Sequence, residues 1–455
     1  MKRSSWRYLW TAHDIRRKLL ITLLLMAIYR LAAHVPVPGA NREALASLLS
    51  GAGAGGQAAG TLVGILDLLS GGTVSNFSVL AMGVYPYITA QIILQLLAPI
   101  IPAWQRRMEE DPRAWQKWME KWTLILTIPM AALQAIGQIN IFSTMAGAPV
   151  IGGFGLFESE WLFSWTVVLS MTAGTMFGIW LGELISEYGI RNQGLSLLIF
   201  AGIVAQIPGN IQRILVGAAN SWFLALVLLL VVIVLVIFLI VIVQQGRRNI
   251  PVMYPGRRVG RGTSMPVKGT LPLMVNMAGM IPLIFAQSLL TFPSIIASFG
   301  TNSTIQWVKD LSTNVYVTFS GGNNIYWLLY FLMVVFFTFF YTDVLFQQQN
   351  YGENLKKMGA QIPGVARGAP TQRYLNRVLR RITLPGALFL GFIAVLPVLV
   401  TGLLSLVGID MGDGSGLLLV TSSGLLIVTG VVRDTFQNID AELKLRGYDD
   451  ARLVR

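Results

Sequence analysis

The stretch NSWFLALVLLLVVIVLVIFLIVIV, residues 220–243, contains no charged side chain and decides the class of fold. An α-helix needs about 20 apolar residues to cross the ~30 Å hydrocarbon core of a bilayer, and this stretch is long enough to do so. Nine other segments follow the same pattern, at 15–34, 77–98, 122–142, 161–182, 194–212, 271–293, 325–346, 383–404 and 415–432. The sequence therefore predicts an all-α polytopic membrane protein with ten transmembrane helices.

Basic residues fall on alternate sides of these spans. Of the 34 Lys and Arg residues, 30 lie in the N-terminal tail 1–18, the loops 99–121, 183–193, 244–270 and 347–382, and the C-terminal tail 433–455. The intervening loops are almost free of them. Because loops rich in Lys and Arg stay in the cytoplasm during insertion, this pattern predicts that both termini are cytoplasmic.

Composition and missing motifs exclude several classes of protein. Hydrophobic residues make up 54% of the chain and charged residues 12%, which predicts one integral membrane domain. The net charge of +13 lies in the cytoplasmic loops, where anionic lipid headgroups are the simplest partners. There is no cysteine, and neither His13 nor His34 belongs to a catalytic set. The sequence therefore predicts no enzyme activity, no metal and no cofactor.

The chain divides into two halves by the number of its spans. Five spans lie in residues 1–212 and five in residues 220–455, and we expect residues 213–219 to form an external hinge between them. Because five is odd, the second half must enter the membrane in the opposite sense, as in inverted repeats. Between spans one and two, the apolar string TLVGILDLL (61–69) is too short to cross, so it predicts a half-helix at the outer face.

Two spans are interrupted by glycine and proline. Gly83 and Pro86 break span two, whereas Gly279 and Pro282 break span seven, which also carries the amide of Asn276. Such breaks are tolerated where the backbone faces protein or a cavity, so they predict a movable seam between these two spans. We expect Asn276 to hold this seam closed by hydrogen bonding to Thr89 or Gln95 of span two. In span four, Gly174, Gly178 and Gly182 form one smooth face for close helix packing.

Six strings carry a family resemblance: SGGTVSNFSVLAMGVYPYITAQIILQLL (70–97), GTMFGIWLGELISEYGI (174–190), LIFAGIVAQIP (198–208), LPLMVNMAGMIPLIFAQS (271–288), ENLKKMGAQIPG (353–364) and LKLRGY (443–448). Together they resemble SecY, the central subunit of the bacterial protein-conducting Sec translocon. The resemblance implies that the two inverted five-helix halves form a clamshell around an hourglass pore. It also implies a lateral gate between spans two and seven, a plug helix, and a ring of aliphatic side chains at the waist.

The resemblance assigns roles to individual positions. The pore ring would consist of Val84, Ile88, Leu195, Ile199, Ile284 and Ile427. The plug would consist of Thr61, Leu62, Val63, Ile65, Leu66, Asp67, Leu68 and Leu69, within the half-helix already noted. The lateral gate would include Thr89, Gln95, Asn276 and Pro282. From helical periodicity alone, 84/88 and 195/199 each place two aliphatic groups on one face, as ordinary core contacts also do.

The two long cytoplasmic loops would dock partners. Their implied binding residues are Arg247, Arg248, Arg257, Arg258, Arg261, Lys356, Lys357 and Arg367. The family commonly has an arginine at the position of Ala366, so the role passes here to Arg367. The implied partners are the SecA ATPase, the ribosome, SecE-like and SecG-like small subunits, signal sequences, nascent polypeptides and membrane lipid, with no sequence-specific binding of nucleic acid. The implied location is the bacterial cytoplasmic membrane.

The sequence thus predicts a channel subunit that moves unfolded polypeptides across the membrane and releases apolar segments sideways into lipid. A secondary transporter of a small solute, built from inverted repeats, is the alternative. That class uses charged or cation-coordinating groups at the membrane midplane, and the spans carry few. An intramembrane enzyme or a structural scaffold is less favoured, because catalytic sets are missing and two helices are broken.

Overall fold

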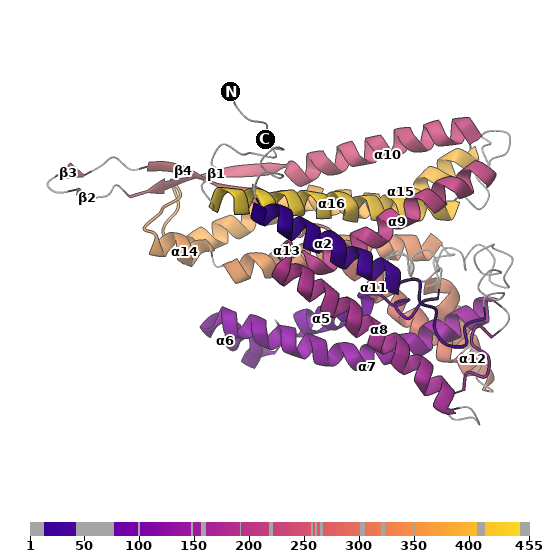
Figure 1. Ribbon diagram of the computed structural model, residues 1–455. Coiled ribbons are helices and arrows are strands. Elements are labelled where there is room, and N and C mark those ends of the chain that lie inside the picture. Colours follow the sequence, from indigo (N-terminus) through magenta and orange to yellow (C-terminus); the bar gives the residue numbers. More distant parts are fainter. Residues whose placement is uncertain are drawn as a thin grey trace.

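The computed structural model describes residues 13–41, 77–98, 101–146, 149–155, 161–191, 193–217, 222–255, 258–259, 262–263, 267–300, 305–319, 324–349, 351–406 and 415–445. Most of the helices run along a common direction, and a β-ribbon extends beyond one end of the bundle (Figure 1). The helices that coincide with the predicted spans are α2 (His13–Ala32), α5 (Tyr85–Leu97), α7 (Pro112–Ala146), α8 (Trp161–Tyr188), α9 (Gly194–Gly217), α10 (Trp222–Gln245), α11 (Ile281–Gly300), α13 (Asn324–Gln349), α15 (Ala369–Leu406) and α16 (Ser415–Leu445). Each predicted span therefore corresponds to a helix in the described part of the chain.

Several of these helices are suited to a membrane by length and composition. Within the described residues, α7, α8, α13 and α15 each contain a stretch long and apolar enough to cross. A fifth candidate is the pair formed by α5 and α6 (Pro102–Glu110), which is bent by 94° at a short break. Shorter apolar helices occupy 194–205, 233–245 and 281–297. The loops contain two further helices, α12 (Gln306–Phe319) and α14 (Tyr351–Lys357).

Spans two and seven are less helical than the sequence predicted. Residues 77–84 form turns before α5, and residues 275–280 form a loop before α11. Gly83 and Gly279 have φ angles of +51° and +65°, which other residues rarely adopt, so an α-helix cannot run through them. In each case a proline, Pro86 or Pro282, follows three positions later, in the first turn of the helix. Backbone N–H groups in that turn have no hydrogen-bond partner within the helix, so the N–H that proline lacks is not missed.

The all-α prediction also misses a β-hairpin. Strands β1 (Arg247–Tyr254) and β4 (Val267–Met274) pair antiparallel, with Arg247 opposite Met274 and Tyr254 opposite Val267. Short strands β2 (Arg258–Val259) and β3 (Gly262–Thr263) pair further out. Residues 271–274, predicted to start a membrane helix, belong to β4, because Ile250, Val252 and Leu273 alternate inward in strand fashion.

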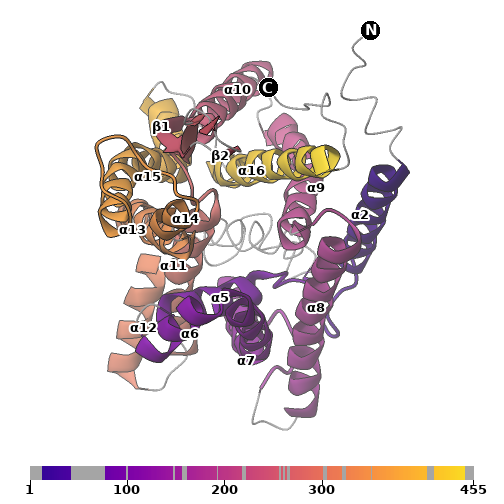
Figure 2. The ribbon, with the colours of Figure 1, turned by 90° about the vertical axis from the view of Figure 1, so that its left-hand side faces the viewer.

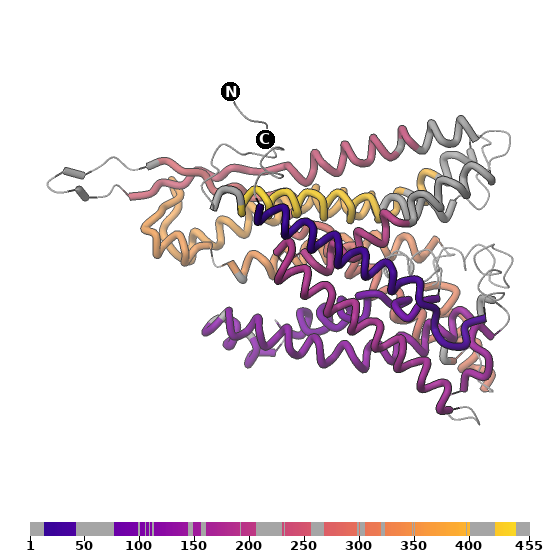
Figure 3. Tube along the Cα trace, viewed as in Figure 1, coloured from indigo at the N-terminus to yellow at the C-terminus, as the bar shows by residue number. Residues whose placement is uncertain are grey.

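The two halves of the chain contact each other along two seams. On one side α11 packs against α5 and α7, and on the other α9 packs against α10 and α16. In the view along the bundle these seams lie on opposite sides (Figure 2). The trace follows the first half from indigo to magenta and the second half from pink to yellow (Figure 3). We call the first of these contacts the gate seam and the second the back seam.

Helix α12 lies outside the predicted spans and packs on α11. Its Tyr316 contacts the apolar cluster formed by α7, α8 and neighbouring segments. Burial raises the pKa of the Tyr316 phenol to about 12, so the group stays protonated at physiological pH. The helix thus packs on α11 and places a neutral phenol against the apolar cluster.

The glycine face of α8 packs as the sequence predicted. A Cβ on Gly174 would lie 2.2 Å from the carbonyl oxygen of Val79, and a Cβ on Gly182 would lie 2.7 Å from Cδ2 of Leu195. The segment 77–84 and helix α9 therefore approach α8 more closely than any larger residue permits. Within the first half, this contact is close and leaves little freedom for movement.

We predict that Gly174→Ala destabilises the protein. The added methyl group meets backbone, which cannot rotate away, so overpacking should lower the free energy of unfolding by about 1–3 kcal/mol. The measurement is the thermal unfolding midpoint of the purified protein in detergent. Gly152→Ala is the control, because no heavy atom lies within 4 Å of its Cβ position. Equal midpoints for the two variants would contradict this packing.

Candidate functional site

The six predicted ring residues belong to one apolar cluster that joins both halves. Val84 and Ile88 come from the start of α5, Leu195 and Ile199 from α9, Ile284 from α11 and Ile427 from α16. Five of them are buried, with exposed fractions between 1% and 8%, and Leu195 is partly buried against the same cluster. The fold thus brings together residues up to 343 positions apart in the sequence.

A chain of polar contacts lies within the gate seam. The hydroxyl of Tyr85 on α5 donates to the carbonyl oxygen of Ser288 on α11 at 3.1 Å. Thr89 donates to the carbonyl oxygen of Tyr85 at 3.0 Å, and Nε2 of Gln134 on α7 donates to the Thr89 hydroxyl at 3.3 Å. The hydrogen bond from Tyr85 to Ser288 therefore connects α5 directly to α11 across the gate seam.

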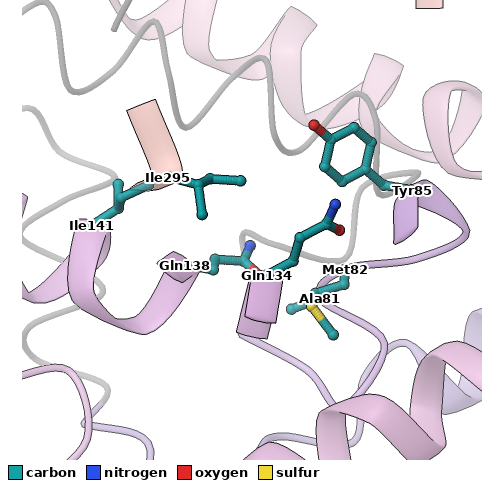
Figure 4. A pocket seen from close by; sticks show the side chains of 7 residues that line it. All are labelled: Ala81, Met82, Tyr85, Gln134, Gln138, Ile141 and Ile295. Carbon is teal, nitrogen blue, oxygen red and sulfur yellow. The ribbon is translucent and has the colours of Figure 1, made fainter. Parts of the chain in front are cut away.

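A small pocket opens beside these contacts. Its lining comes from the end of the 77–84 segment, from α5, α7 and α11, and consists of Ala81, Met82, Tyr85, Gln134, Gln138, Ile141 and Ile295 (Figure 4). The Oε1 atoms of Gln134 and Gln138 are buried, and no described residue provides a hydrogen-bond partner for either. A buried carbonyl oxygen without a hydrogen-bond partner lowers stability by about 1–3 kcal/mol. Contact with water would therefore stabilise these two side-chain oxygens.

Asn276 does not make the contact that the sequence suggested. Its Nδ2 donates to the carbonyl oxygen of Gly279 at 3.1 Å, and its Oδ1 accepts from the N–H of Gly279 at 2.9 Å. The expected bond to Thr89 or Gln95 is therefore wrong, because both ends of the amide stabilise the loop before α11. Thr89 instead pairs with Tyr85 and Gln134, and Oε1 of Gln95 is buried without a partner among the described residues.

Some predicted residues cannot be placed. The plug residues at 61–69 lie outside the described residues, as do Arg257 and Arg261. Arg258 is described through its backbone, which pairs with Thr263 in the outer hairpin. Pro282 is buried in the first turn of α11. The remaining predicted binding residues, Arg247, Arg248, Lys356, Lys357 and Arg367, are all exposed.

The two long loops form a single body. Met253 of β1 and Gln361 exchange two backbone hydrogen bonds, at 2.8 and 2.9 Å. Beneath them lies a separate apolar core, whose buried members are Ile250, Val252, Leu273, Phe346, Leu355, Ala360, Ile362, Leu375, Leu379 and Ile382. We call the unit formed by β1, β4, α14 and residues 358–368 the platform. Because this core packs the platform against the ends of α13 and α15, its surface residues hold fixed positions relative to one another.

The platform also exposes apolar side chains that sequence reasoning missed. Met358 is 64% exposed, and Met253 and Tyr254 are close to 40% exposed. Arg367, in the turn between Gly364 and Gly368, is an exposed basic residue of the same platform. In the sequence RRNIPVMY, apolar Ile250 and Val252 stand two positions apart, and the structure buries both while it exposes their neighbours. This period of two is typical of a strand and could have predicted both β1 and its exposed face.

Apolar side chains from both halves meet in one cluster, and the gate seam beside it contains a short chain of polar contacts. Within the described residues, no group of three or more His, Asp or Glu side chains is placed to hold a metal. The model of one protein family, described as SecY, matches residues 78–436. The chain belongs to the SecY family. It is 38% identical to the protein translocase subunit SecY of Aquifex aeolicus over 97% of both chains.

Other SecY proteins and solved channels support the same assignment. Protein translocase subunit SecY of Mycobacterium bovis is 39% identical over 96% of both chains. Among solved structures, one described as a protein-conducting channel superposes with a TM-score of 0.60 at 17% identity, covering 96% of this chain and 93% of the other. Sec61 from a canine ribosome–channel complex gives a TM-score of 0.57 with the same coverage. At these identities the structural matches establish the fold that SecY-family members share.

We predict that Tyr85→Phe opens the gate seam more often. Hydrogen bonds between membrane helices contribute about 0.6 kcal/mol on average, so losing this one should raise the separated population about threefold. Because the chain has no cysteine, a Leu97→Cys and Leu289→Cys pair can carry spin labels on α5 and α11. Electron paramagnetic resonance would measure the distance distribution. Tyr188→Phe, at an exposed position on α8, is the control, and an unchanged distribution for Tyr85→Phe would assign the seam to apolar packing alone.

Proposed function

We propose that this chain is a non-catalytic, protein-conducting channel subunit that passes unfolded polypeptides across the membrane and releases apolar segments sideways into lipid. The observation that carries the proposal is the single apolar cluster to which both halves contribute ring candidates, Val84 and Ile88 from one and Ile284 and Ile427 from the other. A family assignment over most of the chain supports the same function. The alternative of a small-solute transporter lacks such support.

The ring would act as a seal. A narrow apolar constriction excludes water and therefore hydrated ions, because ions lose their hydration without compensation there. Branched aliphatic side chains have no hydrogen-bonding groups, so they do not hold a polypeptide that passes between them. The same ring can therefore block ions at rest and close around a chain in transit.

The gate seam would let apolar segments leave. Each Leu-like residue gains about 0.3–0.6 kcal/mol on entering lipid, so a run of about ten gains ~3–6 kcal/mol. The seam between α5 and α11 contains weak polar contacts, and the unpaired oxygens of Gln134 and Gln138 would become hydrated on opening. The polar contacts of the seam would therefore add little to the free energy of opening.

The platform would receive the partners that supply energy, the SecA ATPase or the translating ribosome, while SecE-like and SecG-like subunits would brace the two halves. Its exposed basic groups, such as Lys357 and Arg367, suit acidic surfaces, and Met358 adds an apolar contact. In this arrangement the platform and both termini face the cytoplasm of a bacterium, and residues 61–69 plug the outer side. The proposed hinge is at 213–219, of which the structure describes residues 213–217 as the end of α9.

We predict that replacing Val84, Ile88, Ile199 and Ile284 together with Ser raises ion conductance at rest. Hydroxyl groups wet the constriction and enlarge it, whereas the helices retain most of their contacts. The measurement is single-channel current in planar bilayers, with the assembled complex and with residues 61–69 deleted in both parent and variant.

The matched control replaces four exposed aliphatic residues, Leu24, Leu169, Leu230 and Leu328, with Ser. It removes the same kind of side chain from the lipid-facing surface, so it should remain as ion-tight as the parent. If the ring variant is equally tight, these residues pack a solid core and the passage lies elsewhere.

We also predict that reversing the charge of Arg257, Arg258 and Arg261 together weakens partner docking but not insertion. In the sequence these arginines lie in the loop that connects β1 to β4, and the proposed partners have anionic or acidic surfaces. Binding of purified SecA and of ribosomes should fall at least fivefold at low salt, with a smaller difference at high salt. Unchanged affinity for both partners would show that the three charges only set the orientation of the chain in the membrane.

A further inference from the structure

Helix α15 presents one exposed face along most of its length. The exposed positions on this face are Arg373, Arg377, Arg380, Arg381, Leu384, Leu388, Phe392 and Leu399. They recur at intervals of three, four and seven residues, which places them along one side of an α-helix. The opposite side is buried in the protein, as Leu379, Leu390 and Ile393 show.

The character of this face changes abruptly along the helix. Leu384, Leu388 and Phe392 are 46–52% exposed and form an apolar stripe, which in a membrane protein faces lipid tails. The next exposed residues toward the platform are Arg380 and Arg381, followed by Arg377. At 1.5 Å of rise per residue, Arg381 lies about 5 Å beyond Leu384 and Arg377 about 10 Å beyond it. The interfacial layer of a bilayer is about 5–8 Å thick, so these guanidinium groups reach the level of the phosphates.

Only part of this charge is balanced by the protein. Arg380 donates to the carboxylate of Asp343 on α13 at 3.2 Å, which places the arginines beside the groove between α13 and α15. Arg381, one position after Arg380, and Arg377, three positions before it, are also exposed on this face. A site with more positive than negative charge at this depth suits an anion that is itself anchored in the membrane.

We propose that Arg377, Arg380 and Arg381 form a binding site for the headgroup of an acidic phospholipid, with the acyl chains lying along Leu384, Leu388 and Phe392. A guanidinium group can donate two parallel hydrogen bonds to one phosphate, which gives Arg an advantage over Lys at such a site. The lipid is favoured over a protein partner because the arginines continue the lipid-facing stripe, whereas the platform exposes its own basic groups further out. The inference requires only that the chain spans a membrane.

The test compares lipid retention by the full complex, purified from membranes that contain phosphatidylglycerol and phosphatidylcholine. Native mass spectrometry counts the phosphatidylglycerol molecules retained per complex. We expect R377Q/R381Q to reduce this retention at least fivefold, because each basic residue near a membrane surface strengthens binding about fivefold. Phosphatidylcholine retention should be unchanged, and R377K/R381K should restore part of the loss.

The matched control is K356Q/K357Q on α14, which removes the same charge from an exposed position on the platform. Retention equal to the parent in R377Q/R381Q, or an equal loss in the control, would overturn the proposal. A photoreactive residue at Leu388 gives a second measurement that does not depend on retention. Crosslinking to phospholipid supports the site, whereas crosslinking to a protein subunit shows that the face is a protein interface and contradicts it.

Discussion

The structure depends on one constraint, that backbone N–H and C=O groups inside a membrane must be paired within the protein. Two segments at this depth are not helical, and each is paired in its own way. In the first, the N–H of Val79 donates to Val35 and the N–H of Val37 donates to Phe77. In the second, Asn276 replaces the missing helical bonds with its side chain, and the N–H of Val275 donates to Gly246. Both gate helices can therefore begin inside the bundle.

The same constraint explains why the two breaks look alike. Gly83 with Pro86, and Gly279 with Pro282, stand three residues apart in corresponding spans of the two halves. Each pair ends an irregular segment and starts a helix, so α5 and α11 both begin beside the apolar cluster. Glycine and proline breaks in matching spans of inverted repeats mark the central site of many transporters, and here they mark the gate seam. Elsewhere in the first half, Gly174 and Gly182 bring α8 into close contact with residues 77–84 and with α9.

How much the sequence could predict follows from the range of each interaction. Spans are set by local composition, so all ten were predicted, and the spacing of Gly174, Gly178 and Gly182 correctly predicted close packing. The predicted hydrogen bond from Asn276 to Thr89 or Gln95 was wrong because the amide can also bond to the backbone three residues away. The sequence alone does not show which of the two partners, local or distant, is preferred. The hairpin was missed because Leu271 and Leu273 are as apolar as the residues of a membrane helix, so residues 271–274 were assigned to span seven. The arginines of α15 were counted for topology, although their helical spacing already placed them on one face.

The platform is connected to the gate seam both by the chain itself and by a hydrogen bond. Strand β1 follows α10 after one residue, and β4 leads into α11 through residues 275–280. At the base, the bond from Val275 to Gly246 ties the two ends of the hairpin together, so the ribbon cannot move without moving this loop. The loop in turn is held by the Asn276 side chain, which is a light restraint compared with a helix. Under the proposed function, a partner that displaces the hairpin would therefore act first on the start of α11, the helix that accepts the hydrogen bond of Tyr85 across the gate seam.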